Sequence, residues 1–121
     1  MGKPKKCIYL LEDNDDIREM LQFLLEDDYE VFGYESIKSF SKVMEYGRPD
    51  MIILDVMLGD GNGFDVCNSL KKNSSTNHIP ILMMSANAQF FTTKDKCKAE
   101  DFINKPFDID DFVRRVNRFI N

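Results

Sequence analysis

The chain alternates short apolar runs with longer segments in which apolar residues recur every three or four positions. A short apolar run bounded by turn residues is typical of a strand buried on both faces, whereas the longer period is typical of an amphipathic helix. Five strands are predicted: Cys7–Leu11, Tyr29–Tyr34, Met51–Asp55, Ile81–Met84 and Asp101–Lys105, of which Tyr29–Tyr34 only alternates weakly. Gly33 lies inside the second of them, which predicts a strand at or near an edge of the sheet.

Helix caps and charges mark the segments between the strands. Asn14 and Ser36 are suitable N-cap residues, and Asp110 and Asp111 complement the positive end of a helix dipole. Four helices are predicted, over residues 14–25, 36–47, 64–72 and 108–120. Asn87–Lys98 lacks an apolar period, so the further helix expected there should be short or irregular.

Asp55 stands where a wholly apolar run, Met51–Leu54, ends and a glycine-rich turn begins. Strands that alternate with helices predict a parallel sheet covered by helices on both faces. In such sheets ligands bind beyond the C-terminal ends of the strands, so this carboxylate is well placed for chemistry. The alternative is an aspartate that only starts a turn, a role that this residue type often has.

Other strand ends carry polar side chains too. Two acids, Glu12 and Asp13, follow the first strand. Ser85 follows the fourth strand, and Lys105 ends the fifth just before a proline. With these residues in this order, the chain resembles the receiver domain of two-component response regulators over essentially its whole length. The resemblance makes Asp55 the phosphoacceptor, with the acidic pair, the hydroxyl and the lysine as its partners.

The resemblance implies a flavodoxin-like (βα)5 fold, a three-layer sandwich whose five-stranded parallel sheet has the strand order 2-1-3-4-5. The first and third strands are then neighbours, so Glu12, Asp13 and Asp55 converge. One receiver domain is expected over residues 1–121, with residues 1–5 as a flexible tail. The chain is either a stand-alone regulator or a receiver that belongs to a longer protein.

Three neighbouring carboxylates repel one another and therefore require a cation, and oxygen-only ligands favour Mg²⁺ or Mn²⁺. The resemblance implies that Asp13, Asp55 and the backbone carbonyl of Met57 bind this metal ion. Glu12 is one methylene longer than the aspartate usual at its position, so we expect it mainly to hold metal-bound water.

Phosphoryl transfer requires positive charge and hydrogen-bond donors around the phosphoryl oxygens. Lys105 supplies an ammonium, Ser85 a hydroxyl, and Met57 and Ala86 supply backbone N–H groups. The resemblance also implies a cis peptide bond between Lys105 and Pro106, which directs the lysine into the site. A histidine kinase or a histidine phosphotransfer protein is the expected phosphoryl donor.

The loop after the acceptor differs from the family pattern. The usual Met-Pro reads Leu58-Gly59 here, which leaves the rigidity of the loop open, whereas Gly63 matches the closing glycine. Met57 and Asn87 flank the path of the water that hydrolyses the phosphoaspartate in the family. We expect the bulky, apolar Met57 to slow this hydrolysis, although it could instead simply pack against the loop.

The resemblance implies a signalling face built from the segment 87–98, the fifth strand and the last helix. Phe102 matches the switch aromatic of the family, and with Phe90 and Phe91 it would make this face apolar. We expect the face to bind a downstream protein or a second copy of the chain after phosphorylation. The alternative is that Phe90 and Phe91 pack into the core.

Composition narrows the partners and the location. The 121 residues are 43% hydrophobic, enough for one core, and 21 acidic against 16 basic residues disfavour direct nucleic-acid binding. No stretch has the length of a membrane span and the start lacks a signal-peptide core, so a cytoplasmic protein without membrane association is expected. Cys7, Cys67 and Cys97 are far apart, which predicts reduced, mostly buried thiols.

Two other functions share some of these features. An aspartyl-phosphate phosphatase of the haloacid dehalogenase type also combines a strand-end aspartate, a hydroxyl, a lysine and Mg²⁺, but its second aspartate would stand at Met57. A receiver-like interaction module would keep the fold without being phosphorylated. A phosphatase turns over phosphomonoesters, a receiver takes one phosphoryl group, and the module takes none. We expect a signalling phosphoacceptor that catalyses only its own phosphorylation and dephosphorylation.

Overall fold

The computed structural model describes residues 4–87 and 97–120. Its central layer is a parallel sheet of five strands: β1 (Lys6–Leu11), β2 (Tyr29–Tyr34), β3 (Met51–Asp55), β6 (Ile81–Ser85) and β7 (Asp101–Asn104). The strands lie in the order β2-β1-β3-β6-β7. When the five strands of this sheet are numbered along the chain, β6 is the fourth and β7 the fifth, so this is the predicted order 2-1-3-4-5. The strand that contains Gly33, β2, lies at an edge, as expected.

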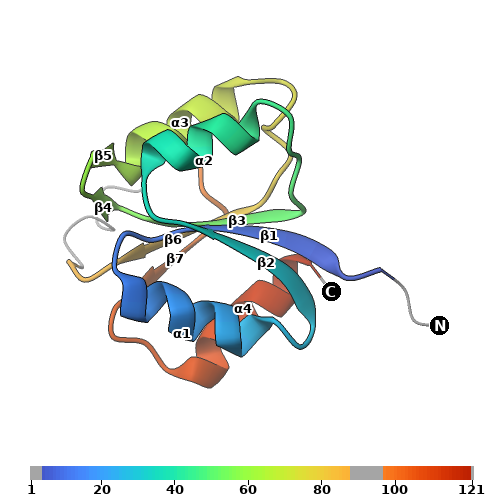
Figure 1. The fold of residues 1–121 in the computed structure, drawn as a ribbon, viewed down its shortest axis with the longest axis vertical. Helices are drawn as coiled ribbons and strands as arrows, with labels where there is room; N and C mark the ends of the chain where they lie inside the picture. The colour runs from blue at the N-terminus through green and yellow to red at the C-terminus, as the bar shows by residue number, and fades with distance from the viewer. Residues whose placement is uncertain (1–3, 88–96, 121) are drawn as a thin grey trace.

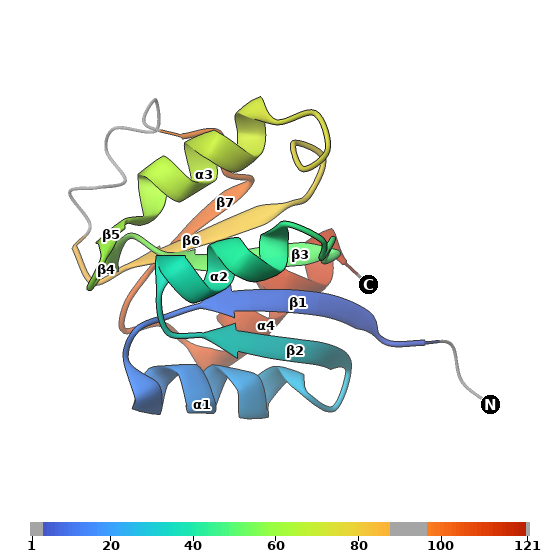
Figure 2. The same ribbon diagram turned by 45° about the horizontal axis from the view of Figure 1, so that its top comes forward.

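Helices cover both faces of the sheet, which completes the three layers of the predicted flavodoxin-like fold (Figure 1). α1 (Asp15–Leu25) and α4 (Ile109–Phe119) lie on one face, and α2 (Ile37–Met44) and α3 (Gly63–Lys72) on the other. Figure 2 shows the five strands side by side between these helices. The short or irregular helix expected over 87–98 falls almost entirely outside the described residues, as do Phe90 and Phe91.

None of the helices in the described ranges is both long and apolar enough to cross a membrane.

Local sequence determines where the helices begin. The side chains of Asn14, Ser36 and Asp108 each accept a hydrogen bond from the backbone N–H three residues further on, at 3.0, 3.1 and 3.0 Å. The first N–H groups of a helix have no partner within the helix, and these side chains satisfy one of them in each case. The helix starts predicted from capping residues are therefore confirmed.

β3 shows why a central parallel strand is a continuous apolar run. Met51 and Ile53 pack into the core beneath α1 and α4, whereas Ile52 and Leu54 pack into the core beneath α2 and α3. Successive side chains of a strand point to opposite faces, so two cores require apolar residues at every position. Asp55 is the polar residue that ends this buried strand.

A short hairpin, β4 (Met57–Leu58) and β5 (Gly61–Asn62), follows β3, where the sequence predicts only a glycine-rich turn. Gly63 comes directly after the hairpin, and its N–H donates to the carbonyl of Val56 at 2.7 Å. A Cβ atom on Gly63 would lie 2.0 Å from the carbonyl oxygen of Asp55. The main chain at this position therefore requires glycine.

We expect Gly63→Ala to lower the free energy of unfolding by about 3 kcal/mol, because the added methyl group would overlap backbone atoms that cannot move aside. Thermal unfolding measures the effect. Gly59→Ala is the matched control: among the described residues other than its chain neighbours, a Cβ there would meet Asp13 Oδ2 alone within 4 Å, at 3.8 Å. Equal losses in the two variants would mean that close contact with Asp55 does not explain the glycine.

Candidate functional site

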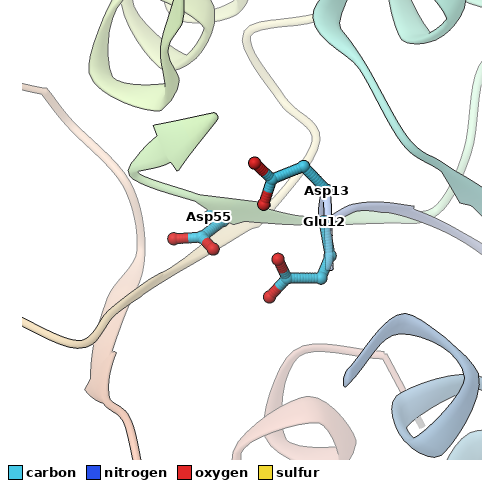
Figure 3. A group of neighbouring side chains, drawn as sticks. All are labelled: Glu12, Asp13 and Asp55. Atoms are coloured by element: carbon cyan, nitrogen blue, oxygen red, sulfur yellow. The ribbon is translucent and has the colours of Figure 1, made fainter. Parts of the chain in front are cut away.

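The pairing of β1 with β3 brings together the acids at their ends. Leu11 pairs with Leu54, so Glu12 and Asp13 continue beyond the sheet beside Asp55. One carboxylate oxygen from each acid lies within 4.8 Å of the other two. Figure 3 shows the three side chains around the space between the two strand ends. The acids therefore converge, as the predicted strand order requires.

The three carboxylates fit a hard cation. Glu12 and Asp55 are only 1% and 6% exposed, whereas Asp13 is open to solvent. Among the residues that the structure describes, none donates a hydrogen bond to the Asp13 carboxylate, which is therefore available as a ligand. Like charges this close, two of them buried, repel unless a cation lies between them, and oxygen-only ligands suit Mg²⁺.

Lys105 brings one positive charge to this cluster from the chain just after β7. Its Nζ donates a hydrogen bond to Asp55 Oδ2 at 2.7 Å and another to Glu12 Oε1. The peptide bond to Pro106 is cis, as the resemblance implies. The lysine side chain is 14% exposed, so it lies in the site and not on the surface.

Burial and neighbouring charges determine the protonation of Glu12 and Lys105. Burial raises the pKa of Glu12 to about 7, the hydrogen bond from Lys105 opposes this rise, and the charge of Asp55 adds to it. Burial acts against the charge on Lys105, but its hydrogen bonds to Asp55 and Glu12 prevail and raise its pKa above the usual value. Lys105 therefore remains an ammonium at neutral pH.

The contact between Glu12 and Lys105 does not follow from the sequence pattern, which assigns Glu12 to metal-bound water. The carboxylate also accepts a hydrogen bond from the Asn14 N–H at 3.2 Å. A buried carboxylate needs a partner of opposite charge, so a basic residue beside Glu12 is expected on general grounds. The strand-end position and the family resemblance place Lys105 beside Asp55, but they do not indicate that it also pairs with Glu12. The role of Glu12 toward metal-bound water remains a prediction.

Ser85 ends β6 directly after Met84, which pairs with Asp55, so its hydroxyl lies at the same edge of the sheet. The residue is 1% exposed, and its Oγ accepts a hydrogen bond from the Asn87 N–H at 3.0 Å. Ala86 and Asn87 are exposed. The roles of these three residues in phosphoryl binding and hydrolysis remain predictions.

Met57 lies beside the site, whereas Phe102 lies in strand β7 of the sheet. The Met57 N–H donates to Asp55 Oδ1 at 3.3 Å, and the methionine side chain is 64% exposed beside the site. Phe102 pairs with Met83 in the sheet and lies half-buried against the core beneath α2 and α3. It is not a member of the acidic cluster, and its role as a switch remains a prediction.

The arrangement suits the transfer of a phosphoryl group to a carboxylate. Asp55 can act as a nucleophile, and Lys105 can neutralise charge on the phosphoryl oxygens. Glu12 and Asp13 add the carboxylates that a cation requires. Phosphoryl transfer asks a protein for this combination of positioning and positive charge.

Comparisons with known proteins identify a family to which the chain is similar. A family model described as the response regulator receiver domain matches residues 8–117. Histidine kinase P4 of Formosa agariphila is 27% identical over 120 residues, which cover 98% of this chain and 9% of that protein. The phosphate regulon transcriptional regulatory protein PhoB of Escherichia coli is 33% identical over 115 residues, or 90% of this chain and 49% of PhoB. The chain thus spans half or less of the length of these curated relatives.

Among solved structures, the signal receiver domain of a signal transduction histidine kinase from Syntrophus aciditrophicus has a TM-score of 0.87 and 25% identity to this chain. The match covers 95% of this chain and 89% of that one. It extends the similarity from the sequence to the complete arrangement of sheet and helices.

Proposed function

The chain belongs to the response regulator receiver domain family, and from that premise we propose that Asp55 accepts a phosphoryl group from the phosphohistidine of a histidine kinase or a histidine phosphotransfer protein. One observation supports this most strongly. The buried Asp55 carboxylate accepts a hydrogen bond from Lys105 at 2.7 Å and lies beside two further acids, Glu12 and Asp13. No simple packing role explains why three acids and a lysine gather at one edge of the sheet, with Glu12 and Asp55 buried.

Each residue has a task in this reaction. An Asp55 oxygen attacks phosphorus, a P–O bond forms, and the P–N bond to the donor imidazole breaks with its electron pair going to the nitrogen. Lys105 moves its hydrogen bond from the carboxylate to a phosphoryl oxygen as the negative charge moves. The Ser85 hydroxyl and the N–H groups of Met57 and Ala86 donate to the remaining oxygens.

A metal ion completes the proposed site. Asp13, Asp55 and the Met57 carbonyl would hold Mg²⁺ or Mn²⁺, and Glu12 would hold water bound to the ion. The ion would supply positive charge to the phosphoryl group when bound. Support comes from the carboxylate oxygens within 4.8 Å of one another and from the exposed Asp13 side chain.

The proposal is tested by incubating the protein with acetyl phosphate and Mg²⁺ and then measuring its intact mass. We expect the mass increase of one phosphoryl group per chain. Turnover of a general phosphomonoester in the same buffer would instead favour the phosphatase alternative. An unmodified chain would favour the interaction module and overturn the proposal.

An apolar hollow beside Lys105 suits the docking of the phosphoryl donor. It has a volume of about 470 Å³ and is lined by Ile17, Met20, Ala86, Lys105, Pro106, Phe107 and Ile109. Met20 on α1 and Ile109 on α4 are 42% and 49% exposed, so this apolar surface is available to a partner. A donor helix that docks here brings its phosphohistidine next to the Lys105 side of the site.

The phosphorylated protein then signals through a second surface in this proposal. We expect that surface to include β7 and α4 and to bind a downstream protein or a second copy of the chain; most of the segment 87–98, which the family resemblance adds to it, lies outside the described residues. Sedimentation with beryllofluoride and Mg²⁺, which mimic the phosphorylated state, tests for the second copy. The proposed setting is the cytoplasm, and the three free cysteines, of which Cys67 and Cys97 are buried as expected, are consistent with a reducing compartment.

We expect Met57→Asn to speed the loss of the phosphoryl group several-fold, because an amide can orient the attacking water and methionine cannot. The wild-type side chain is 64% exposed, so its removal should leave stability nearly unchanged. The decay of the phosphorylated mass over time measures the rate, with a melting curve as control. Equal or slower decay at unchanged stability would show that Met57 does not control hydrolysis.

A further inference from the structure

Asp60, in the turn between β4 and β5, reaches across to the start of α2. Its Oδ1 accepts a hydrogen bond from the Ile37 N–H at 3.0 Å, and its Oδ2 accepts one from the Lys38 N–H at 3.1 Å. The helix has its own N-cap, Ser36, which satisfies the Ser39 N–H at 3.1 Å. Asp60 therefore caps two further N–H groups of α2 from a different segment of the chain.

The contact is favourable for both partners. A carboxylate at the N-terminus of a helix interacts with the positive end of the helix dipole. The hydrogen bond from Ile37 is the main cause that lowers the pKa of Asp60 below its usual value. The carboxylate is therefore ionised at neutral pH and binds the helix as an anion.

The glycines on either side of Asp60 show how the described residues pack around this turn. Apart from its chain neighbours, Asp13 Oδ2 is the only atom of the described residues within 4 Å of a Cβ at Gly59, so these residues pack little on that side of the turn. At Gly61 a Cβ would lie 2.7 Å from Ile37 Cδ1, which shows how closely the hairpin lies against the first residue of α2. Asp60 and this approach together fix the hairpin to the helix.

The hairpin carries a backbone group of the proposed site. Met57 and Asn62 pair across β4 and β5, and the Asn62 side chain accepts a hydrogen bond from the Phe64 N–H at 2.7 Å at the start of α3. The hairpin is thus attached to the N-termini of two helices, to α2 through Asp60 and to α3 through Asn62. A backbone carbonyl can bind a metal ion well only if its segment is held in place.

We propose that Asp60 is a positioning residue for the metal site. Through its two hydrogen bonds to α2 it holds the hairpin, and with it the Met57 carbonyl, in the orientation that binds the ion. This inference rests on the proposed function, because it requires that Met57 is a ligand. It assigns to Asp60 a holding role in a loop where Gly59 stands in place of the family's proline.

The test compares the Mg²⁺ affinity of four proteins: wild type, Asp60→Ala, Asp60→Asn and Asp65→Asn. The chain has no tryptophan, so the affinity is measured from amide chemical shifts during titration with Mg²⁺. We expect Asp60→Ala to weaken binding about fivefold, the change that corresponds to loss of one helix cap. Asp60→Asn should lie between alanine and wild type, because its amide oxygen still accepts one hydrogen bond.

Asp65→Asn is the matched control for charge. Asp65 is an exposed acid in the first turn of α3 and lines the same groove between α2 and α3 as Asp60. Its substitution should leave the affinity close to that of wild type, since exposed charges are screened by salt. Hydrogen exchange of the Ile37 and Lys38 amides should be faster in Asp60→Ala than in Asp60→Asn.

Two results would overturn this inference but leave the proposed function intact. Equal weakening in all three variants would mean that only negative charge matters. Unchanged affinity in Asp60→Ala, with a lowered melting temperature, would mean that Asp60 caps α2 without any effect on the metal site. If the wild type itself failed to bind Mg²⁺, the proposed function would be overturned, and this inference with it.

Discussion

Replacing Asp55 with asparagine is expected to abolish phosphorylation by acetyl phosphate while the fold remains intact. Asparagine has the shape of aspartate, and its amide oxygen can still accept the hydrogen bond that Lys105 donates at 2.7 Å. The amide is not a nucleophile, so no acyl phosphate forms. The substitution also removes one charge from a group in which each close pair repels by about 4 kcal/mol at an effective dielectric constant of about 20. The metal-free variant should therefore melt no lower than wild type.

Intact mass after incubation with acetyl phosphate and Mg²⁺ measures the first effect, and thermal unfolding in the presence of a chelator measures the second. Asp65→Asn is a suitable control, because it removes the same charge from an exposed position outside the acidic cluster. A phosphoryl group on the Asp55→Asn chain would place the acceptor elsewhere and contradict the proposed function.

Lys105→Met is expected to destabilise the metal-free protein by about 3 kcal/mol, the lower end of the range for removing one partner of a buried ion pair. The substitution leaves Glu12 and Asp55, with side chains 1% and 9% exposed, without their nearest positive charge. Methionine has a similar length, so the loss comes from charge more than from packing. Mg²⁺ should restore part of the stability, because it supplies positive charge to the same carboxylates.

The effect of Lys105→Met should depend on pH. Burial already raises the pKa of Glu12 to about 7, and loss of the hydrogen bond from Lys105 removes the main opposing influence. Because the pKa of Glu12 is higher in the folded than in the unfolded protein, protonated Glu12 stabilises the fold. This contribution to stability is fully present below the unfolded-state pKa of about 4.5. It is lost as the pH rises through the folded-state pKa of about 7. The variant should therefore be more strongly destabilised, relative to wild type, at about pH 8 than at about pH 5.

Chemical unfolding at the two pH values, with and without Mg²⁺, measures these differences. Lys6→Met is the matched control, since Lys6 is an exposed residue at the start of β1, the strand that leads to Glu12. It should show little change at either pH. A pH-independent loss in Lys105→Met would mean that Glu12 does not carry the expected pH dependence.

Local sequence by itself determined most of the framework. The apolar runs gave the strands their places, because a strand buried on both faces needs an apolar residue at every position, as in Met51–Leu54. Asn14 and Ser36 marked helix starts, because an N-cap needs only an N–H three residues away. The acids at strand ends indicated a site, since the C-terminal edge of a parallel sheet collects them. The strand order came from the family resemblance and not from periodicity.

The tertiary structure alone decided two contacts, that of Glu12 with Lys105 and that of Asp60 with the start of α2. Glu12 and Lys105 are 93 residues apart, and Asp60 is 23 residues from Ile37. No local pattern relates such residues, because helix and strand periods connect positions only a few residues apart. Whether Lys105 also contacts Glu12, and which turn residue caps a distant helix, depends on the strands and the hairpin that bring these residues side by side. The close contact of Gly63 with Asp55 arises in the same way, from two backbone segments that meet only in the folded chain.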